Sequence, residues 1–373
     1  MRLLVDCHCF DYPTPQGINT YLRGIYSELI PIAKDIDFFL AAADTDNLKQ
    51  IFGEHPNVHY VKIDHGGSLK RLLKIFPTAI KQNNIDWAHF QYVTPFIKNC
   101  KTIVTLHDIL FEDFPQFFPI SYRLSKGMLF KYSAKRADLL LTVSNYSRNR
   151  ISAHYKINES DIKVTPNAVS DVFSKIGKEE ARKYVKEHFG LDKYVLFVSR
   201  MEPRKDQYGL IQAYLKSNLI SKGVDLAIVG DQSLKDARIE QLLSSISDDL
   251  KGHIHFFSSV SNEELYPLYR GASLFVYPSK AEGFGIPPLE AAVAEIPVIC
   301  NNATAMNDYD FFEPYLIDTE YCDNLAAKME ECIAVPASEE RLQSVKQKIM
   351  QKYNWATIAS DYYKILNGIS AKG

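Results

Sequence analysis

The sequence predicts an α/β protein made of two doubly wound, Rossmann-like domains, each with a parallel sheet. Three observations lead to this prediction. Short β-rich runs alternate with helical stretches along most of the 373 residues, which is typical of parallel α/β layers. Most of these runs are continuous in Val, Ile, Leu and Phe, as expected for strands that helices cover on both faces. The chain is also too long for one ordinary domain and suits two.

The predicted strands fall into two series. The first series has six strands, at residues 2–7, 37–43, 58–63, 87–91, 102–108 and 139–144. The second series has five strands, at residues 194–200, 225–231, 253–259, 273–279 and 296–301. A polar stretch from Ser170 to Gly190 separates the two series and is typical of a hinge followed by a charged helix. We therefore expect one domain over residues 1–170 and a second over 171–354.

Charge and hydropathy exclude several classes of protein. The chain has 43 Lys and Arg against 45 Asp and Glu, a net charge of −2, which argues against a nucleic-acid partner. Apolar runs stay well below the roughly 18 consecutive residues that a membrane-spanning helix needs. The first residues, MRLLVDCHCFDYP, do not resemble a secretory leader, because no apolar core follows a basic start.

The six cysteines are too few in so long a chain to form a disulfide framework. The Cys7-His8-Cys9 cluster closes the first predicted strand, where successive side chains point to opposite faces. No second pair completes the four ligands of a metal site. We therefore expect buried strand cysteines with reduced thiols, and a cytoplasmic protein.

Charge is divided unevenly along the chain. Residues 1–178 carry a net charge of +5 and the remainder a net charge of −7. Two segments of the basic half, 65–85 and 114–137, contain no acidic residue but several lysines and arginines among apolar and aromatic residues. Each segment alone fits a solvated helix face. Both together also fit peripheral docking on the anionic inner face of the cytoplasmic membrane, and the two interpretations stay open at this point.

Polar residues at strand ends are the candidates for chemistry, because open parallel sheets bind ligands outside the carboxyl ends of their strands. In the first half, Gly17 precedes a predicted helix, where the backbone can approach an anion and free N–H groups attract it. His107 ends a strand and can donate or accept hydrogen bonds near neutral pH. An ordinary turn and a satisfied edge histidine are the structural alternatives.

The first strand of the second series is followed by three cations in the stretch SRMEPRK, residues 199–205. Two cations that face one cleft can neutralise a pair of phosphates, since Arg offers a planar fork of donors and Lys a point charge. The structural alternative is a solvated loop that caps the helix beginning near Asp206.

A glycine-rich loop with two carboxylates follows the strand at 273–279. In EGFGIPPLE, residues 282–290, the loop amides and the helix start suit a phosphate, and the two prolines stand where a helix needs no N–H. Glu282 lies in the loop and Glu290 about one turn into the helix. Ionised carboxylates accept hydrogen bonds from hydroxyl groups, so the two can hold opposite ends of one ligand.

These motifs resemble the retaining glycosyltransferases of family 4, which have the GT-B fold. EGFGIPPLEAAVAEIPVI is similar to the E-x7-E element of that family, and SRMEPRKD to its diphosphate-binding loop. TLHDILFEDFPQFFP and the Gly17 loop match its mannosyltransferase-like members. YNWATIASDYYKIL resembles the closing helices that return to the N-terminal domain, which assigns residues 355–373 to the first domain. The family's usual Asn-Gly-Val is Asn167-Ala168-Val169 here, and its usual Pro-Glu is absent from NNATAMNDYD.

The resemblance implies a role for each matching residue. Arg200 and Lys205 would bind the donor diphosphate and stabilise the leaving nucleoside diphosphate. Glu290 would hold the ribose hydroxyls, and Glu282 the hydroxyls of the transferred sugar. The other implied contacts are His107 near the reacting face of the sugar, Gly17 near the phosphates, and the amides of Phe284, Gly285 and Ile286 beside Glu282. The implied catalytic residues are Glu282, His107, Arg200 and Lys205.

The chemistry explains why such residues are needed. Cleavage of a sugar–phosphate bond develops negative charge on the leaving phosphate, which preorganised cations and helix ends stabilise. Because the chain supplies these groups, we expect no metal and no cofactor other than the donor. Asp-x-Asp occurs at Asp35 and Asp37, at Asp44 and Asp46, and at Asp308 and Asp310, but such pairs are common chance matches. Closure of two domains would keep water from hydrolysing the donor.

The expected function is transfer of a hexose from a nucleotide-diphosphate sugar to a glycan. The expected acceptor is lipid-linked, and the expected process is synthesis of a surface polysaccharide or lipopolysaccharide. GDP-mannose is the leading donor, and UDP- or dTDP-sugars are alternatives. Two other classes remain as alternatives. A nicotinamide oxidoreductase lacks support, because the GxGxxG fingerprint is missing. A non-catalytic nucleotide-sugar-binding protein is disfavoured by the intact set of site residues.

Overall fold

The computed structural model describes residues 1–12, 17–231 and 236–370, and the chain forms two compact units. The first unit comprises Met1–Ala168 together with Tyr353–Gly373, and the second comprises Val169–Lys352. The first unit thus ends at Ala168, where the sequence predicts 170. The returning segment begins at Tyr353, where the sequence predicts 355, and residues 371–373 of the predicted segment lie outside the described residues.

The first unit is built on a seven-stranded parallel sheet in the order β3-β2-β1-β4-β5-β6-β7. Its strands are β1 (Arg2–Asp6), β2 (Asp37–Ala42), β3 (Val58–Lys62), β4 (Trp87–Gln91), β5 (Lys101–Leu106), β6 (Leu139–Thr142) and β7 (Ile162–Val164). The strand order reverses between β1 and β4, the kind of position at which doubly wound sheets bind ligands.

The second unit has a six-stranded parallel sheet in the order β10-β9-β8-β11-β12-β13, with its reversal between β8 and β11. Its strands are β8 (Tyr194–Val198), β9 (Asp225–Val229), β10 (Ile254–Phe257), β11 (Leu274–Tyr277), β12 (Val298–Asn301) and β13 (Leu316–Ile317). The central strands of both sheets are almost wholly buried, as their unbroken apolar sequences require.

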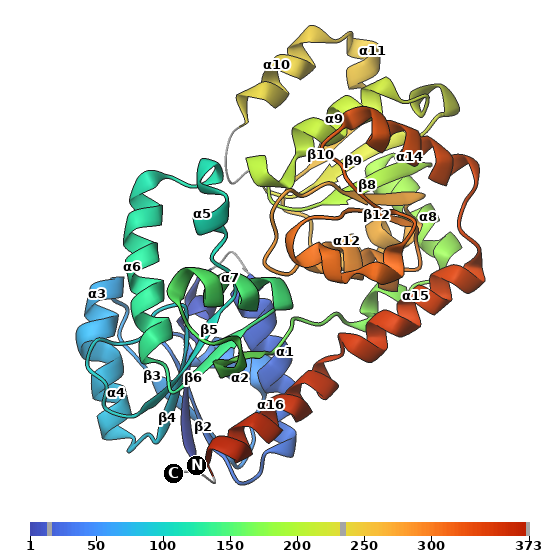
Figure 1. The fold of residues 1–373 in the computed structure, drawn as a ribbon. Helices are drawn as coiled ribbons and strands as arrows, with labels where there is room; N and C mark the ends of the chain where they lie inside the picture. The colour runs from blue at the N-terminus through green and yellow to red at the C-terminus, as the bar shows by residue number, and fades with distance from the viewer. Residues whose placement is uncertain (13–16, 232–235, 371–373) are drawn as a thin grey trace. The chain divides into compact units, whose positions relative to one another are not determined.

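Helices flank the strands of each sheet (Figure 1). The first unit contains α1 (Gly17–Ile32), α2 (Thr45–Phe52), α3 (Ser68–Lys70), α4 (Phe76–Gln82), α5 (Leu110–Asp113), α6 (Ile120–Arg136), α7 (Asn145–Tyr155) and α16 (Trp355–Ser370). The second contains α8 (Lys178–Phe189), α9 (Gln207–Lys216), α10 (Ala237–Ser245), α11 (Asp248–Lys251), α12 (Asn262–Gly271), α13 (Ile286–Val293), α14 (Cys322–Ala334) and α15 (Glu339–Lys352).

All eleven predicted strands are present, and the predicted fold class is confirmed. The short edge strands β7 and β13 are additions. The prediction of a strand cysteine at position 9 is wrong, because β1 ends at Asp6 and His8–Asp11 form a 3-10 turn. Cys7 is buried and Cys9 is half-buried, and all six thiols are free.

Helix α16 belongs to the core of the first unit through its contact with α1 (Figure 1). The indole of Trp355 lies on Gly24, so closely that a Cβ on Gly24 would stand 2.2 Å from Cε2 of the indole. Two turns further on, Tyr362 is fully buried, and its hydroxyl lies 3.4 Å from Nδ1 of His89 in β4. The returning segment therefore fills a gap that the first 168 residues leave open.

This contact predicts that Gly24→Ala destabilises the first unit. The added methyl group would displace the indole of Trp355 from its packing position on α1. Overpacking of this kind lowers the free energy of unfolding by about 1–3 kcal/mol. We expect a lower melting temperature and faster proteolytic release of residues 353–370. Gly368→Ala on the same helix is the matched control, because no atom lies within 4 Å of its Cβ position. Equal melting temperatures for the two variants would contradict the prediction.

Candidate active site

A buried ion cluster joins the two loops that leave the sheet reversal of the second unit. Lys205 ends a 3-10 turn (Pro203–Lys205) after β8, and Glu282 lies in the loop after β11. The ammonium group of Lys205 forms an ion pair with Oε1 of Glu282, and both side chains are buried. The hydroxyls of Tyr277 and Ser279 donate to the same oxygen at 2.9 and 2.6 Å. The loop sequence thus brings together two residues predicted for the site.

Arg204 ties the same two loops together at further points. Its Nη1 donates to the carbonyl of Ala281 at 2.8 Å and to Oε2 of Glu282 at 3.2 Å, and its Nε donates to Glu202 at 2.8 Å. The amide of Lys280 donates to the carbonyl of Arg204 at 2.8 Å. The sequence predicted Arg204 only as one of three neighbouring cations. Its hydrogen bonds to the loop of Glu282 are a finding of the structure.

The cluster holds its charges at neutral pH. Burial by itself raises the pKa of Glu282, but the neighbouring Lys205 and Arg204 outweigh burial and hold that pKa well below its usual range. Burial lowers the pKa of Lys205, and the attraction of Glu282 offsets part of this effect. Removing one member of such a buried group would leave an uncompensated charge, which is strongly destabilising. Each charged residue of the cluster therefore requires the others.

Hydrogen-bonding capacity remains for a ligand. An ammonium group has three donors, and Lys205 uses two of them, on Glu282 and on the hydroxyl of Tyr277 at 2.8 Å. One N–H is therefore left for an additional acceptor such as a phosphate oxygen. Arg200 is available for a different reason, because its side chain is 51% exposed and its ion pair with Glu202, at 3.2 Å, lies at the surface.

The glycine-rich loop points its carbonyl groups into the protein. The hydroxyl of Tyr309 donates to the carbonyls of Phe284 and Gly285, at 2.7 and 3.1 Å. Among the described residues, no acceptor receives the amides of Gly285, which precedes α13, and of Ile286, its first residue. These two amides can serve an anion at the helix start.

Glycine is required at position 285 by its backbone conformation. Its φ is +92°, and a Cβ there would lie 3.2 Å from Met306. The sulfur of Met306 is in turn 3.4 Å from that of Cys300 in β12. The loop therefore rests on the segment after β12, whose Thr304 hydroxyl accepts from the amide of Glu282 at 3.0 Å. This support from the NNATAMNDYD stretch was not predicted.

Glu290 lies in α13 and has different surroundings from Glu282. The hydroxyl of Tyr269 in α12 donates to its Oε2 at 2.8 Å. Burial raises the pKa of Glu290 to about 7, and the hydrogen bond from Tyr269 offsets only part of this rise. Glu282 is thus a fixed carboxylate, whereas Glu290 changes its charge near neutral pH. Only the ionised form is a pure acceptor for ligand hydroxyls.

In the first unit, His107 follows β5 and is buried. Its Nε2 lies 2.8 Å from Oε1 of Gln91, and an amide oxygen can only accept, so Nε2 carries the ring proton. Gln91 in turn donates to Nε2 of His89 at 3.2 Å, and Nδ1 of His89 lies 2.6 Å from the hydroxyl of Tyr26. The network reaches from α1 to the end of β5.

Burial lowers the pKa of His107 to about 3, so its imidazole is neutral at pH 7. A neutral ring with a fixed tautomer supplies hydrogen bonds rather than a proton. Sequence reasoning found His107 but missed Gln91 and His89, because alternate residues of a buried strand look like ordinary core positions.

Gly17 is the first residue of α1, and no atom of the described residues beyond its chain neighbours lies within 4 Å of its Cβ position. The preceding Pro15 and Gln16 of the predicted loop lie outside the described residues.

His, Cys, Asp and Glu side chains form no group of three or more suited to a metal ion within residues 1–12, 17–231 and 236–370. The described residues include all three Asp-x-Asp pairs.

Two family models match the chain. One, described as glycosyl transferases group 1, covers residues 178–348, and the other, described as glycosyltransferase family 4, covers residues 15–172. O-antigen chain mannosyltransferase B of Escherichia coli is 31% identical over 326 residues, 82% of this chain and 84% of that protein. O-antigen chain mannosyltransferase RfbU of Salmonella typhimurium is 30% identical over 222 residues, 58% of this chain and 56% of that protein.

Solved structures share the fold. Sucrose-phosphate synthase from Thermosynechococcus elongatus superposes with a TM-score of 0.80 at 17% identity, over 100% of both chains. HepE of Anabaena, crystallised with UDP and glucose, superposes with a TM-score of 0.76 at 19% identity, over 99% of this chain and 100% of that one.

The surroundings of Glu290 predict a pH-dependent affinity for a nucleoside diphosphate whose ribose hydroxyls donate to this carboxylate. With a pKa of about 7, the ionised fraction rises about tenfold between pH 6 and pH 8. Since the ligand needs the ionised form, we expect affinity to rise with pH by about that factor. Calorimetric titration of wild type beside Glu290→Gln separates this effect from titration of the ligand. Parallel pH profiles for the two proteins would contradict the prediction.

Proposed function

This chain belongs to glycosyltransferase family 4 and has the GT-B fold, and we propose that it transfers mannose from GDP-mannose to a glycan during surface-polysaccharide synthesis. Membership of the family makes the protein a hexosyltransferase and overturns the alternative of a nicotinamide oxidoreductase. We further propose that the acceptor is lipid-linked and that the reaction retains the anomeric configuration, as the resemblance to the family implies.

The buried cluster of Lys205, Glu282 and Arg204 is the observation that carries the proposal. It fixes the loop after β8 against the loop after β11, at the reversal of the second sheet. Lys205 keeps one donor for the diphosphate, and exposed Arg200 adds a second cation. As the sugar–phosphate bond breaks, negative charge grows on the leaving phosphate, and these fixed cations stabilise it more strongly than they stabilise the intact donor.

The loop amides and the two carboxylates complete the proposed donor site. The amides of Gly285 and Ile286 would meet a phosphate oxygen or sugar hydroxyl at the start of α13. Glu282 accepts three hydrogen bonds on Oε1 but one on Oε2, so Oε2 retains a position for a sugar hydroxyl. Glu290 would receive the ribose hydroxyls. His107 of the first unit would orient a sugar hydroxyl as a neutral hydrogen-bonding group.

The names of the relatives support mannose as the transferred sugar. The ligands in a solved structure of the same fold leave other donors as alternatives. The relatives at about 30% identity are O-antigen mannosyltransferases, which supports GDP-mannose. HepE, with UDP and glucose bound, shares only the fold, and UDP- or dTDP-sugars remain the alternative donors. We also propose that no metal is required, because side-chain cations stand where the diphosphate charge would develop.

A transfer assay tests the function. We expect label from GDP-mannose, offered beside UDP- and dTDP-sugars, to enter a lipid-extractable glycan in a membrane extract. Arg200→Ala should lower kcat/KM by about 10²–10³-fold, since it removes one stabilising cation. Lys216→Ala is the matched control, because Lys216 is 50% exposed and ion-paired in the same unit. The anomeric signal of the product, read by NMR, tests retention.

Two outcomes would contradict the function. Wild-type turnover by the variants Arg200→Ala and Glu282→Gln would show that the proposed site does not carry out the transfer. Donor binding without turnover on any acceptor would favour the non-catalytic alternative. Transfer from a UDP- or dTDP-sugar alone would replace GDP-mannose as donor.

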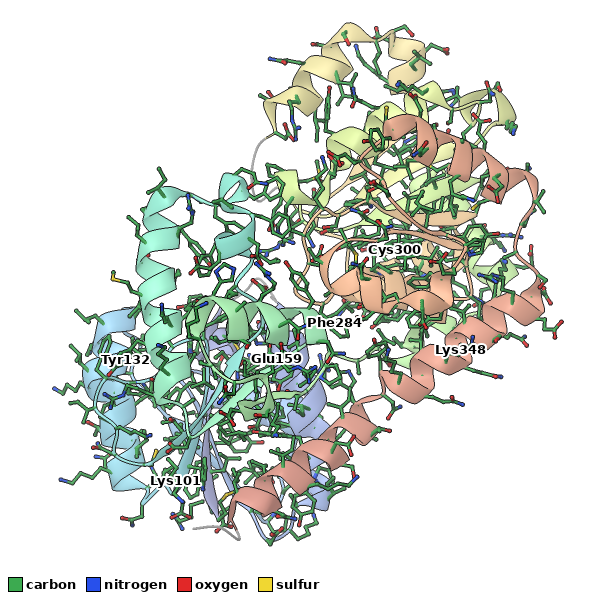
Figure 2. The ribbon with its side chains drawn as sticks, in the orientation of Figure 1. Lys101, Tyr132, Glu159, Phe284, Cys300 and Lys348 are labelled. Carbon is green, nitrogen blue, oxygen red and sulfur yellow. The ribbon has the colours of Figure 1, made fainter. Side chains whose placement is uncertain are left out.

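We propose in addition that α6 docks on an anionic membrane surface. Ile120, Leu124 and Met128 are spaced by four residues on this helix and are 70, 66 and 71% exposed, which forms a continuous apolar stripe. The segment 114–137 has basic but no acidic residues around the stripe. Tyr132, four residues further along the helix and labelled in Figure 2, does not extend the stripe. Its ring packs on that of Phe96, with 5.7 Å between the ring centroids.

The other basic segment contributes less apolar surface than its sequence suggests. Ile75 and Phe76 are buried in the core, which leaves Leu69 and Leu73 as the exposed apolar residues of segment 65–85. A single-pass anchor is not among the helices of the described residues, none of which is both long and apolar enough to cross a bilayer. We propose a peripheral contact through the exposed apolar residues of α6.

Vesicle sedimentation tests the α6 contact. We expect the wild type to bind vesicles that contain phosphatidylglycerol and to bind pure phosphatidylcholine weakly. The triple change Ile120→Ser, Leu124→Ser and Met128→Ser should reduce binding about tenfold or more, since it removes the apolar stripe. The control is Tyr321→Ser with Val335→Ser, two exposed apolar residues of the second unit. An equal loss in both variants, or none, would contradict the docking surface.

A further inference from the structure

A large basic hollow lies in the otherwise acidic second unit. Residues 169–352 contain 21 Lys and Arg against 28 Asp and Glu. A groove of about 780 Å³ nevertheless has six basic residues and only two acidic ones in its lining. We name it the amino-edge groove, and its charged lining residues are Lys178, Glu179, Arg182, Lys183, Lys186, Asp192, Lys193 and Lys222.

The groove lies at the opposite edge of the sheet from the proposed donor site. Its floor includes the residues that immediately precede strands, namely Lys193 before β8, Ser273 before β11 and Pro297 before β12. Glu282 and Lys205 follow the carboxyl ends of β11 and β8. Because β8 has five residues, the two edges are separated by about 16 Å of strand. One small ligand therefore cannot occupy both places.

Half of the six cations in the groove have no acidic partner among the described residues. Glu179 pairs with Arg182 at 2.9 Å, Glu187 with Lys183 at 3.9 Å, and Asp192 with Lys186 at 3.3 Å. Within the part of the chain that the structure describes, Lys178, Lys193 and Lys222 form no ion pair. Burial, together with the nearby charges of Arg182 and Arg270, lowers the pKa of Lys178. An excess of four positive charges thus surrounds the hollow, which attracts anions.

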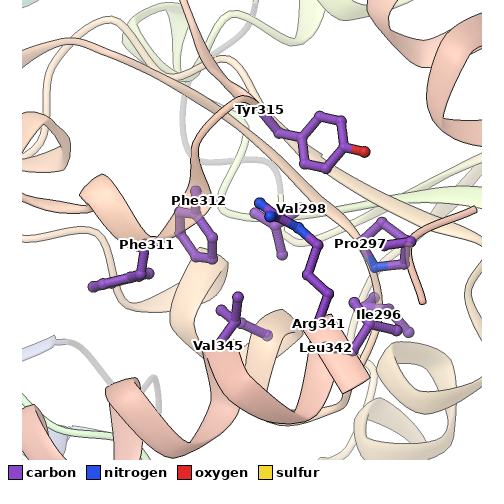
Figure 3. Close-up of a pocket in the computed structure, with 11 residues that line it drawn as sticks. Ile296, Pro297, Val298, Phe311, Phe312, Tyr315, Arg341, Leu342 and Val345 are labelled. Atoms are coloured by element: carbon purple, nitrogen blue, oxygen red, sulfur yellow. The ribbon is translucent and has the colours of Figure 1, made fainter. Parts of the chain in front are cut away.

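The size of the hollow indicates what kind of anion fits. Sites for small molecules usually measure about 300–1,000 Å³, and the groove falls in this range. The neighbouring apolar pocket shares Pro297, Ala337 and Leu342 with the groove, but the side chains of Phe312, Val298 and Arg341 crowd it (Figure 3). Its free space of about 20 Å³ holds one water molecule and no hydrocarbon chain. The groove therefore suits a polar anion better than a lipid tail.

We propose that the amino-edge groove binds a small molecule with at least two phosphate charges, at a site separate from the donor site. Lys193 and Lys222 supply cations ahead of β8 and β9, and Lys178 and Arg182 supply them from the first turns of α8. The half-buried hydroxyl of Ser273 lies on the floor between them. The ligand would bind whether or not the donor site is occupied.

Calorimetric titration with inorganic tripolyphosphate tests this site. We expect two binding events in the wild type, of which Arg200→Ala weakens only one, the event at the donor site. The double variant Lys193→Ala with Lys222→Ala should weaken the remaining event about tenfold, since each charge-assisted hydrogen bond contributes substantially. Lys175→Ala with Lys348→Ala is the control of equal charge change, with both residues outside the groove lining (Lys348 in Figure 2). Melting temperatures verify that both variants fold.

The outcomes separate this proposal from the proposed function. Loss of the donor-site event in Arg200→Ala, with the second event intact, would support both. An event that the groove variant weakens, without any event that Arg200→Ala weakens, would contradict the proposed function and support the groove. Equal binding by the groove variant and its control would overturn the groove. Binding of a single-stranded oligonucleotide, lost in the groove variant while tripolyphosphate does not bind, would also overturn it.

Discussion

The placement of one buried carboxylate, Glu282, constrains most of the second unit. A carboxylate in this position is tolerated only if cations and hydroxyls meet it, so the loop after β8 must bring Lys205 and Arg204 to the loop after β11. This requirement can be met only where β8 and β11 are neighbours, which makes the strand order part of the site. The glycine loop and the segment after β12 then position the backbone of Glu282 itself.

The parts of the fold that depend on long apolar runs could be predicted from the sequence. Strands such as Tyr194–Val198 and Leu274–Tyr277 are buried on both faces, and an unbroken apolar run is the direct signature of this burial. The strands β7 and β13 could not be predicted, because three and two residues are too few to form a pattern. They form by hydrogen bonding to the free backbone edges of β6 and β12. The 3-10 turn at His8–Asp11 could not be predicted for a similar reason, since Cys9 looks like a continuation of β1.

The site residues were predictable where chemistry demands an unusual residue type. Glu282, Lys205 and His107 stand out at strand ends, and the structure brings Glu282 and Lys205 into direct contact. Their partners could not be found in this way. Gln91, Tyr269 and Thr304 lie in a strand, an α-helix and a 3-10 helix outside the motifs. Only the tertiary fold brings them to His107, Glu290 and Glu282. Predicted roles toward a sugar or phosphate stay predictions, whereas the protonation states follow from burial and neighbours.

The return of residues 353–370 to the first unit has a consequence for biosynthesis. The chain crosses between units twice, so the second unit is inserted in the sequence of the first. On the ribosome, residues 169–352 emerge as one uninterrupted stretch and can collapse as soon as they are free. Folding of the first unit stays incomplete, with the Gly24 face of α1 uncovered, until Trp355 and Tyr362 have been translated. The half of the protein that is made first is thus the half that matures last, and during that interval its incomplete core is the surface that a chaperone would guard.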